Sequence, residues 1–201
     1  MSAPQGSAEW LQERCGNATA SEFSSVLAKG QGKTRTAYLR RLVAERLTGK
    51  PMETYKNAHM ERGQEQEPYA RMAYEASTGR MVEEVGFIKH PKLRAGCSPD
   101  GLIGDESGAE IKSVIATVQL ETILAGDYPT EHRAQIQGSM WITGRKTWDF
   151  CSYCHDMPEN LQLYVFTVAR DDAYIMALEA EVVVFLNDVE SLVERLLKRS
   201  A

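Results

Sequence analysis

Residues 98–112 begin with Ser98-Pro99-Asp100-Gly101-Leu102-Ile103 and end with Ala109-Glu110-Ile111-Lys112. Between them lies a turn, GDESG at residues 104–108, and this arrangement of a polar turn between two short apolar runs predicts a β-hairpin. In a tight hairpin the second strand returns alongside the first. The ten positions from Asp100 to Glu110 are about the number needed to bring them next to each other. The sequence therefore predicts an acidic pair at one end of a small sheet.

Glu110 and Lys112 occupy alternate positions on the second strand of this hairpin. Alternate strand residues share a face, so these two side chains lie side by side while Ile111 points into the core. Two carboxylates held close together repel each other unless a cation lies between them, and hard oxygen ligands favour magnesium or manganese. Such a site suits metal-assisted phosphodiester hydrolysis, in which Lys112 positions the attacking water or helps to deprotonate it. By itself the pattern also fits an ordinary surface ion pair.

Helical and extended patterns alternate along the rest of the chain. Capping residues and apolar residues spaced three and four apart predict helices, and β-branched or aromatic runs predict strands. We expect helices at residues 9–14, 22–28, 34–48, 54–78, 117–124, 130–142 and 171–198, and strands at residues 82–88, 102–103, 109–114, 147–153 and 161–168. These elements predict an α+β fold, in which helices flank a small mixed β-sheet.

The length and composition are those of one ordinary globular domain. The chain has 201 residues, of which 43% are hydrophobic and 25% charged, and these values fit a folded domain with a sizeable core. The sequence contains no internal repeat and no linker long enough to separate two domains. We therefore expect one domain over residues 1–201, with a short mobile tail at residues 1–7.

Charge and hydrophobicity exclude several classes of protein. No run approaches the roughly 18 to 20 apolar residues of a membrane span, and residues 1–6 are too polar for the core of a signal peptide. We expect a soluble cytoplasmic protein that does not bind a membrane and whose four cysteines are reduced thiols. The net charge of -5 excludes a strongly basic nucleic-acid-binding domain, so any contact with DNA must be local or mediated by a cation.

Other segments accompany the hairpin in a defined order. They read GQEQEPYAR at residues 63–71, CSPDGL at 97–102, EIK at 110–112 and QIQGSMWIT at 135–143. Together they resemble the YqaJ-type viral recombinase nucleases, the family of lambda exonuclease, within the PD-(D/E)xK superfamily. The resemblance covers most of the chain, because it extends to Trp10, Arg14, Gly16, Thr19-Ala20-Ser21 and Tyr153.

The resemblance implies a restriction-endonuclease-like core, with a central mixed β-sheet flanked by helices, and a metal site on it. It implies that the cation binds Glu67, Asp100, Glu110 and the carbonyl group of Ile111, and that Lys112 and Gln135 serve the water nucleophile.

Two of these assignments depend on the resemblance alone. Glu67 is one of several acids in its predicted helix, together with Glu61 and Glu65, and the residues themselves do not favour one over the others. Gln135 could instead be a solvated helix residue, and Gln137 is the alternative candidate.

The resemblance also implies an activity and an assembly. It implies an exodeoxyribonuclease that requires Mg²⁺, with Mn²⁺ as a substitute, and that degrades linear double-stranded DNA from its 5′ ends. The product is a 3′ single-stranded tail for recombination by strand annealing. The implied assembly is a homotrimeric ring threaded by DNA, with a single-strand annealing protein as partner and a phage or prophage as source.

Three residues match the positions that hold a terminal 5′-phosphate in this family: Arg14, Ser21 and Ser98. Their chemistry suits the task, because a guanidinium group binds phosphate through two parallel hydrogen bonds and hydroxyl groups donate further ones. From the residues alone, Arg14 could instead pair with a surface acid and Ser21 could cap a helix.

Two other functions are also open. One is a DNA endonuclease or repair nuclease of the same superfamily, RecB-like or restriction-like, although the iron–sulfur cysteines of some of those relatives are missing here. The other is a non-enzymatic interaction module, in which Asp100, Glu110 and Lys112 form an ordinary ion-pair network.

Two short motifs do not fit the function that their pattern suggests. CSYCH at residues 151–155 matches a c-type haem attachment motif. Haem attachment requires export, however, and a zinc site requires a second pair of ligands. We therefore interpret Cys151 and Cys154 as half-buried strand residues. KGQGK at residues 29–33 lacks the spacing and the ending of a nucleotide-binding P-loop. We interpret it as a mobile basic loop that touches DNA phosphates. The family's loop carries an arginine there, whereas this chain has Gln31 flanked by lysines.

Overall fold

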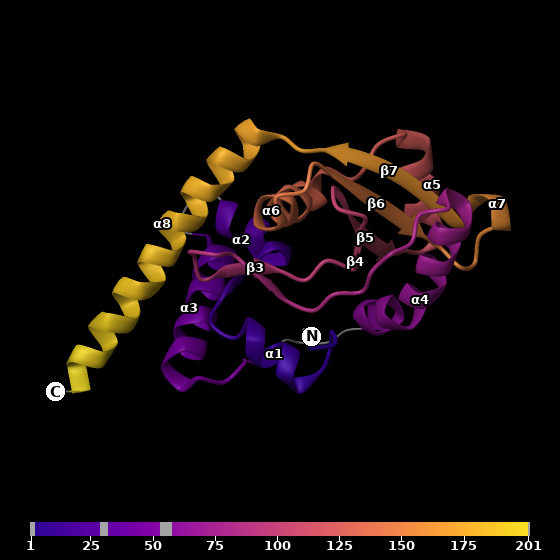
Figure 1. Cartoon of the computed structure of the whole chain (residues 1–201). Coiled ribbons are helices and arrows are strands. Elements are labelled where there is room, and N and C mark those ends of the chain that lie inside the picture. Colours follow the sequence, from indigo (N-terminus) through magenta and orange to yellow (C-terminus); the bar gives the residue numbers. More distant parts are fainter. Residues whose placement is uncertain (1–2, 29–31, 53–57, 201) are drawn as a thin grey trace.

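The computed structural model describes residues 3–28, 32–52 and 58–200, and within these ranges all side chains except those of residues 58–61, 64 and 200. The helices are α1 (Ala8–Arg14), η1 (Ala20–Glu22), α2 (Phe23–Leu27), α3 (Lys33–Thr48), α4 (Ala58–Thr78), α5 (Ala116–Ala125), η2 (Thr130–His132), α6 (Arg133–Thr143), α7 (Glu159–Gln162), α8 (Asp172–Leu197) and η3 (Lys198–Ser200) (Figure 1). The strands are β1 (Ala18–Thr19), β2 (Ile88–Lys89), β3 (Ala95–Cys97), β4 (Gly101–Ile103), β5 (Ser107–Ser113), β6 (Thr147–Tyr153) and β7 (Leu163–Ala169).

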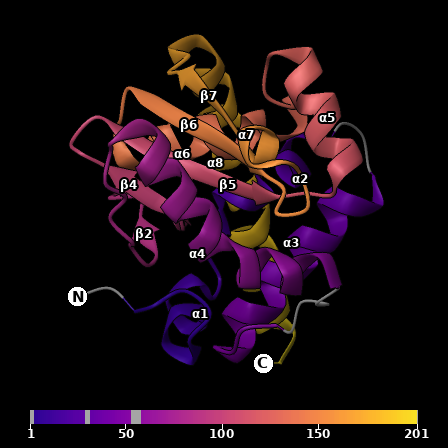
Figure 2. The same cartoon turned by 90° about the vertical axis from the view of Figure 1, so that its right-hand side faces the viewer.

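The larger sheet has four strands in the order β4-β5-β6-β7. β5 pairs antiparallel with β4 and parallel with β6, and β6 pairs antiparallel with β7. α4 lies across one face of this sheet (Figures 1 and 2), and α6 packs against the other. The α4 side is formed by Ala70, Tyr74, Ala109, Ile111, Cys151 and Tyr153, and the α6 side by Ile136, Met140, Trp148 and Phe150. Glu110 and Lys112 alternate with Ile111 and therefore belong to the α6 side.

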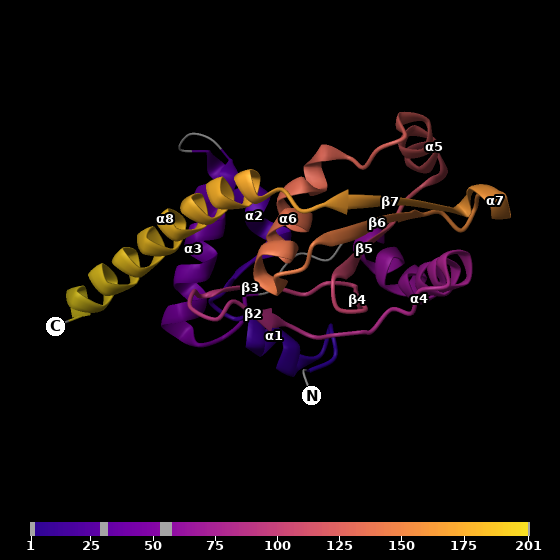
Figure 3. The same ribbon diagram turned by 45° about the horizontal axis from the view of Figure 1, so that its top comes forward.

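The smaller sheet joins the larger one to a layer of helices. Its central strand, β3, pairs parallel with β1 and antiparallel with β2. α8 runs along α3 (Figures 1 and 3), and its apolar stripe, including Leu178, Val182 and Phe185, is buried. The predicted α+β fold is confirmed, although its strands form two mixed sheets rather than one.

Two predicted strands differ from the observed elements. The sequence predicts a strand over residues 82–88, but the observed strand β2 begins only at Ile88. Earlier in this segment, Glu83 forms a single bridge with Leu102. The segment 161–168 contains the end of α7 before β7 begins at Leu163. An apolar pattern indicates which residues are buried, but the neighbouring strand decides how far backbone pairing extends.

Residues 3–7 make hydrogen bonds with other parts of the protein. The Gln5 side-chain amide donates hydrogen bonds to the carbonyl groups of Pro99 (2.7 Å) and Val85 (3.2 Å). Ser7 caps α1 by accepting a hydrogen bond from the backbone N–H of Trp10 (3.1 Å). A polar composition does not reveal contacts with residues 80 or more positions away.

Some expectations fall on residues outside the described ranges, namely residues 1–2 of the tail, 29–31 of the basic loop and 54–57 of the fourth helix. None of the helices described here is long and apolar enough to cross a membrane. All four cysteines are free thiols, and Cys151 and Cys154 are buried more deeply than the half-buried positions that the sequence suggests.

Candidate active site

The hairpin of β4 and β5 brings Asp100 to Glu110. Its register pairs Gly101 with Ala109, so one position further along Asp100 lies level with Glu110. The Asp100 carboxylate also accepts a hydrogen bond from the Ile111 backbone N–H, with 2.6 Å between Oδ2 and N. The adjacency expected from the sequence is therefore found in the structure. Its cause is local, because a short turn fixes the register of the two strands.

The Glu110 carboxylate is buried between β5 and α6, with only 2% of its side chain exposed. Its Oε1 atom accepts hydrogen bonds from Lys112 Nζ (2.6 Å) and from the side-chain amide of Gln135 (2.5 Å). The other oxygen, Oε2, has no hydrogen-bond partner among the described residues. A buried carboxylate oxygen without a donor is costly to the folded state, so such an atom indicates a place where a ligand binds.

Burial and mutual electrostatic interactions shift the pKa values of the ionisable side chains in this centre. Burial and the nearby Glu110 carboxylate raise the pKa of Asp100 well above its ordinary value. Burial opposes the charge on Lys112, but Glu110 and Asp100 outweigh this effect and raise the pKa of the lysine. Burial also raises the pKa of Glu67, against the opposing influence of Arg71. The fold thus holds carboxylates where their negative charge is unfavourable until a cation compensates it.

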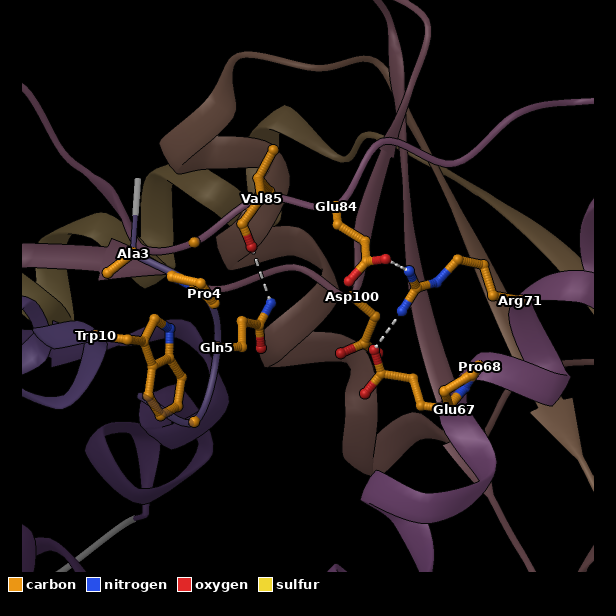
Figure 4. Close-up of a pocket in the computed structure, with 12 residues that line it drawn as sticks. Ala3, Pro4, Gln5, Trp10, Glu67, Pro68, Arg71, Glu84, Val85 and Asp100 are labelled. Carbon is orange, nitrogen blue, oxygen red and sulfur yellow. Dashed lines mark hydrogen bonds and ion pairs between the residues drawn. The ribbon is translucent and has the colours of Figure 1, made fainter. Parts of the chain in front are cut away.

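Glu67 projects from α4 into a cavity of about 680 Å³ (Figure 4). Arg71, Glu84 and Asp100 line the same cavity, and residues 3–6 line it from the N-terminal side. The Arg71 guanidinium group donates a hydrogen bond to Glu67 Oε1 (3.1 Å) and forms an ion pair with Glu84. The cavity therefore connects two of the predicted metal ligands, Glu67 and Asp100, to residues 3–6.

The predicted metal ligands approach one another but do not yet form a closed coordination site. Within the ranges described, no three acidic, histidine or cysteine side chains lie close enough to hold a metal ion as they stand. Glu67 is turned toward Arg71 instead. The donor set nevertheless fits a divalent cation, because Glu67, Asp100 and Glu110 supply hard carboxylate oxygens and Glu110 Oε2 is available.

Arg14 and Ser98 meet beside Trp10. Ser98 Oγ accepts hydrogen bonds from Arg14 Nη1 (2.8 Å) and from the Trp10 indole N–H (3.0 Å). Because this hydroxyl oxygen already accepts two hydrogen bonds, its own O–H is left to donate. Ser21 is exposed, and its hydroxyl group lies 3.3 Å from that of Thr19. The structure thus brings Arg14 and Ser98 into contact and leaves Ser21 bonded elsewhere.

The sequence matches the YqaJ-like viral recombinase domain over residues 9–146, which is more than half of the chain. The chain belongs to this family. Its structure is similar to that of LHK-Exo in complex with dAMP, with a TM-score of 0.90, and to that of LHK-Exo, an alkaline exonuclease from Laribacter hongkongensis, with a TM-score of 0.89. In both cases the sequences are 39% identical over 96% of this chain and 98% of the other.

A phage-related exonuclease from Haemophilus somnus 129PT shares the fold, with a TM-score of 0.67 and 12% identity over 92% of this chain and 96% of the other. Among curated proteins, no sequence matches this chain significantly. The predicted family and fold are therefore confirmed, and these similarities support the predicted enzyme class, a deoxyribonuclease. They disfavour the alternative of a non-enzymatic module.

The two candidate glutamines of this YqaJ-like domain have different surroundings. Gln135 reaches the Glu110 carboxylate, as described above. Gln137 is buried, donates to the Ala169 carbonyl group (2.9 Å) and accepts from the Asp171 backbone N–H (2.9 Å). Residues two apart on a helix point in different directions, so only one of the two can face the carboxylates. Gln137 instead joins the end of β7 to the start of α8.

Sequence reasoning missed Arg71 and Glu84 in the YqaJ-like site. Arg71 lies four positions after Glu67 on α4, and this spacing is a signal that could have revealed their contact. Glu84 lies in an irregular segment after α4, and no regular spacing in the sequence predicts that it meets Arg71.

Proposed function

We propose that this chain is a Mg²⁺-dependent exodeoxyribonuclease that degrades linear double-stranded DNA in the 5′-to-3′ direction and leaves 3′ single-stranded tails. Mn²⁺ would serve as a substitute ion. The observation that carries the proposal is the buried Glu110 carboxylate, which lies beside Asp100 and Lys112 and has one oxygen without a donor in the described part of the chain. The similarity to an alkaline exonuclease supports the reaction class.

The proposed ion would supply two elements of the chemistry, activation of a water molecule and neutralisation of the charge that develops on the phosphodiester group. The residues that would hold it are Glu67, Asp100, Glu110 and the carbonyl group of Ile111. Their oxygens are the hard ligands that Mg²⁺ prefers.

Lys112 and Gln135 act on the same oxygen of Glu110. The Gln135 amide holds Glu110 Oε1 at 2.5 Å and so fixes the direction of the carboxylate. Lys112 has a raised pKa and is therefore protonated at neutral pH in this state. A protonated lysine donates hydrogen bonds, so Lys112 would orient the attacking water and stabilise the phosphate charge rather than remove a proton.

We further propose that Arg14 and Ser98 bind the terminal 5′-phosphate, with Ser21 reaching the same group from the edge. The contact between Arg14 and Ser98 supports this role, because it orients both side chains and leaves the serine hydroxyl hydrogen available to donate. A guanidinium group and hydroxyl donors together recognise a phosphate more strongly than a neutral end.

The proposed assembly is a homotrimeric ring around DNA. The net charge of -5 gives one copy a weak electrostatic hold on DNA, and enclosure would compensate for it. α5 supports contacts between protein chains, because it buries the polar residues Gln119 and Thr122 and exposes Leu120 and Leu124. Light scattering should give the mass of three chains, whereas a monomer that degrades DNA distributively would contradict the ring.

The proposed context is phage or prophage recombination in the bacterial cytoplasm, beside a single-strand annealing protein. The name of the matching family, a viral recombinase domain, supports this context. Co-purification of the chain with an annealing protein encoded beside it would test the partnership.

One assay tests the reaction and its direction. Linear and nicked duplexes carry a label at either the 5′ or the 3′ end of one strand, closed circles carry an internal label, and all are incubated with Mg²⁺ or with a chelator. We expect early release of the 5′ label from linear DNA, retention of the 3′ label, no cleavage of closed circles and no activity with the chelator. Cleavage of closed circles would favour the alternative, a RecB-like or restriction-like endonuclease.

A further inference from the structure

Arg71 is a cationic residue in the cavity wall to which the proposed chemistry gives no task. Among the described residues that line this cavity, it carries the only positive charge. Its side chain is 13% exposed and makes two contacts, from Nη2 to Glu67 and from Nη1 to Glu84. Its Nε atom is buried and has no hydrogen-bond partner in the ranges that the structure describes.

The contacts of Arg71 divide its planar guanidinium group into two parts. Nε and Nη2 lie on one edge of the group, and this edge can form two parallel hydrogen bonds with a carboxylate or a phosphate. Glu67 takes only Nη2 and leaves Nε unused. Glu84 holds the group from its other end, through Nη1. If Glu67 turns away, both donors of this edge are left without a protein partner among the described residues, while the ion pair with Glu84 keeps the group in place.

The charges around the site give Glu67 a reason to turn away. The Glu67 carboxylate is the partner of Arg71 and is also one of the predicted metal ligands. The neighbouring carboxylates of Asp100 and Glu110 favour a cation at this place. A cation at the predicted site therefore competes directly with Arg71 for Glu67.

We propose that Arg71 exchanges Glu67 for a backbone phosphate of the DNA strand when the divalent cation binds. Glu67 would then help to hold the cation, and the Nε and Nη2 edge of Arg71 would bind a phosphate in the cavity while Glu84 keeps its contact with Nη1. This inference rests on the proposed metal site at Glu67. It makes Arg71 a DNA-binding residue whose availability depends on the metal ion.

The exchange has two opposite consequences for a variant that lacks Arg71. Without DNA, Glu67 no longer has a competing partner, so the metal ion should bind more tightly. With the metal ion bound, the phosphate loses its guanidinium partner, so DNA should bind more weakly. If Arg71 only connected α4 to the segment that contains Glu84, the result would differ. Its loss would then loosen the site and weaken metal binding.

The experiment compares Arg71→Ala and Arg71→Lys with the parent protein and with Arg46→Ala. Arg46 is a matched control, because it is a buried arginine that is ion-paired with Glu190, has an unpartnered nitrogen in the described structure and lies outside the cavity lining. Calorimetry measures Mn²⁺ binding without DNA, and steady-state kinetics on linear duplex at saturating Mg²⁺ gives KM and kcat separately. Circular dichroism checks that each variant is folded.

For Arg71→Ala we expect tighter Mn²⁺ binding and a KM that rises by roughly ten-fold or more, the effect of losing charge-assisted hydrogen bonds. The change in kcat should be smaller. Arg71→Lys keeps the charge but loses the two-donor edge, so its KM should also rise. Arg46→Ala should leave Mn²⁺ binding and KM unchanged.

Unchanged KM in Arg71→Ala, or weaker Mn²⁺ binding, overturns the inference. If Arg71→Ala does not fold, Arg71→Lys decides, and a KM equal to that of the parent protein overturns it. Failure of the proposed function would give a different result. In that case Glu110→Gln would not reduce Mn²⁺ binding relative to the parent protein, and Lys112→Ala would retain nuclease activity.

Discussion

Two buried carboxylates lie on neighbouring strands of the larger sheet, Glu110 on β5 and Asp149 on β6, and each residue is 1% exposed. Asp149 has donors on both oxygens: Tyr74 (2.5 Å) and Arg80 (2.6 Å) on Oδ2, and Thr167 (2.7 Å) on Oδ1. Glu110 has two donors on Oε1, whereas in the described parts of the chain nothing donates to Oε2. Equal burial thus accompanies very different hydrogen bonding.

The difference separates a structural carboxylate from one that is prepared for a ligand. Asp149 pairs with Ala109 in the sheet and so faces α4, where it connects that helix to β6 and β7. Glu110 faces α6 on the opposite side of the same strands. A fully bonded buried carboxylate holds the fold together, and a half-bonded one is stable only because the rest of the fold fixes it in place.

The largest effect is expected from Glu110→Gln. The substitution removes the charge of the side chain but keeps its shape. Nuclease activity should fall roughly a thousand-fold, which corresponds to a loss of about 4 kcal/mol of transition-state stabilisation. Thermal stability without metal should stay the same or rise, because repulsion with Asp100 disappears. A nuclease assay and a melting curve measure the two effects. Activity near that of the parent protein would exclude Glu110 from the active site.

Asp149→Ala should lower the stability of the fold, whereas Glu110→Gln should lower the activity. It leaves the buried Tyr74 hydroxyl and the Arg80 guanidinium group without their partner, so the free energy of unfolding should fall by about 4 kcal/mol. Tyr74→Phe removes one hydrogen bond and should cost only about 1 kcal/mol. Urea unfolding measures both. A variant as stable as the parent protein would show that the bonded carboxylate contributes nothing to the fold.

Acid should destabilise the Glu110 side of the sheet through His132, which stacks on Phe150 at 5.3 Å between ring centroids. Burial, assisted by the charge of Lys112, lowers the pKa of His132 to about 4, below its unfolded value of about 6.5. The unfolded chain therefore binds more protons between these two values. His132 should contribute a loss of roughly 3 kcal/mol of stability as pH falls from about 6.5 to 4, and none above that range.

Urea unfolding at several pH values tests this dependence, with His132→Phe as the control. Phenylalanine keeps an aromatic ring against Phe150 but does not titrate, so the variant should lose less stability across this pH range. Identical pH profiles for the two proteins would contradict the role assigned to His132.

The smallest effect concerns the DNA end. Duplexes with a 5′-phosphate should be degraded roughly ten-fold faster than those with a 5′-hydroxyl, because Arg14 and Ser98 provide charge-assisted hydrogen bonds. Arg14→Ala should abolish this preference, and Ser21→Ala should reduce it less, since Ser21 bonds Thr19 instead. Equal rates on both ends with the parent protein would remove the phosphate pocket but leave the Glu110 centre unaffected.

Elements defined by nearby residues could be predicted from the sequence. The strand at residues 147–153 has the predicted bounds, and α8 begins and ends within one residue of its predicted limits. α3 ends at Thr48, and Gly49 follows it with a positive φ of 66°, as expected for a glycine that closes a helix. In each case the signal is local, because periodicity and capping act over only a few residues.

The contacts between distant segments could not be predicted in this way. The choice of Gln135 over Gln137 follows from how α6 is rotated against β5. The contact of Arg71 with Glu84 follows from the path of the chain after α4. The strand order of each sheet likewise depends on pairing between segments that are far apart in the sequence.

The sequence by itself determined which residues can carry the chemistry and, through the hairpin, that Asp100 and Glu110 lie together. Tertiary structure alone decided which carboxylate is fully bonded and which is not. Asp149 gave no signal in the sequence, although it is as buried as Glu110. The physical reason is that hydrogen-bond donors such as Tyr74, Arg80 and Gln135 reach these carboxylates from helices and turns 25 or more positions away. Only packing of those segments against the sheet sets whether a buried charge stabilises the fold or remains available to a ligand.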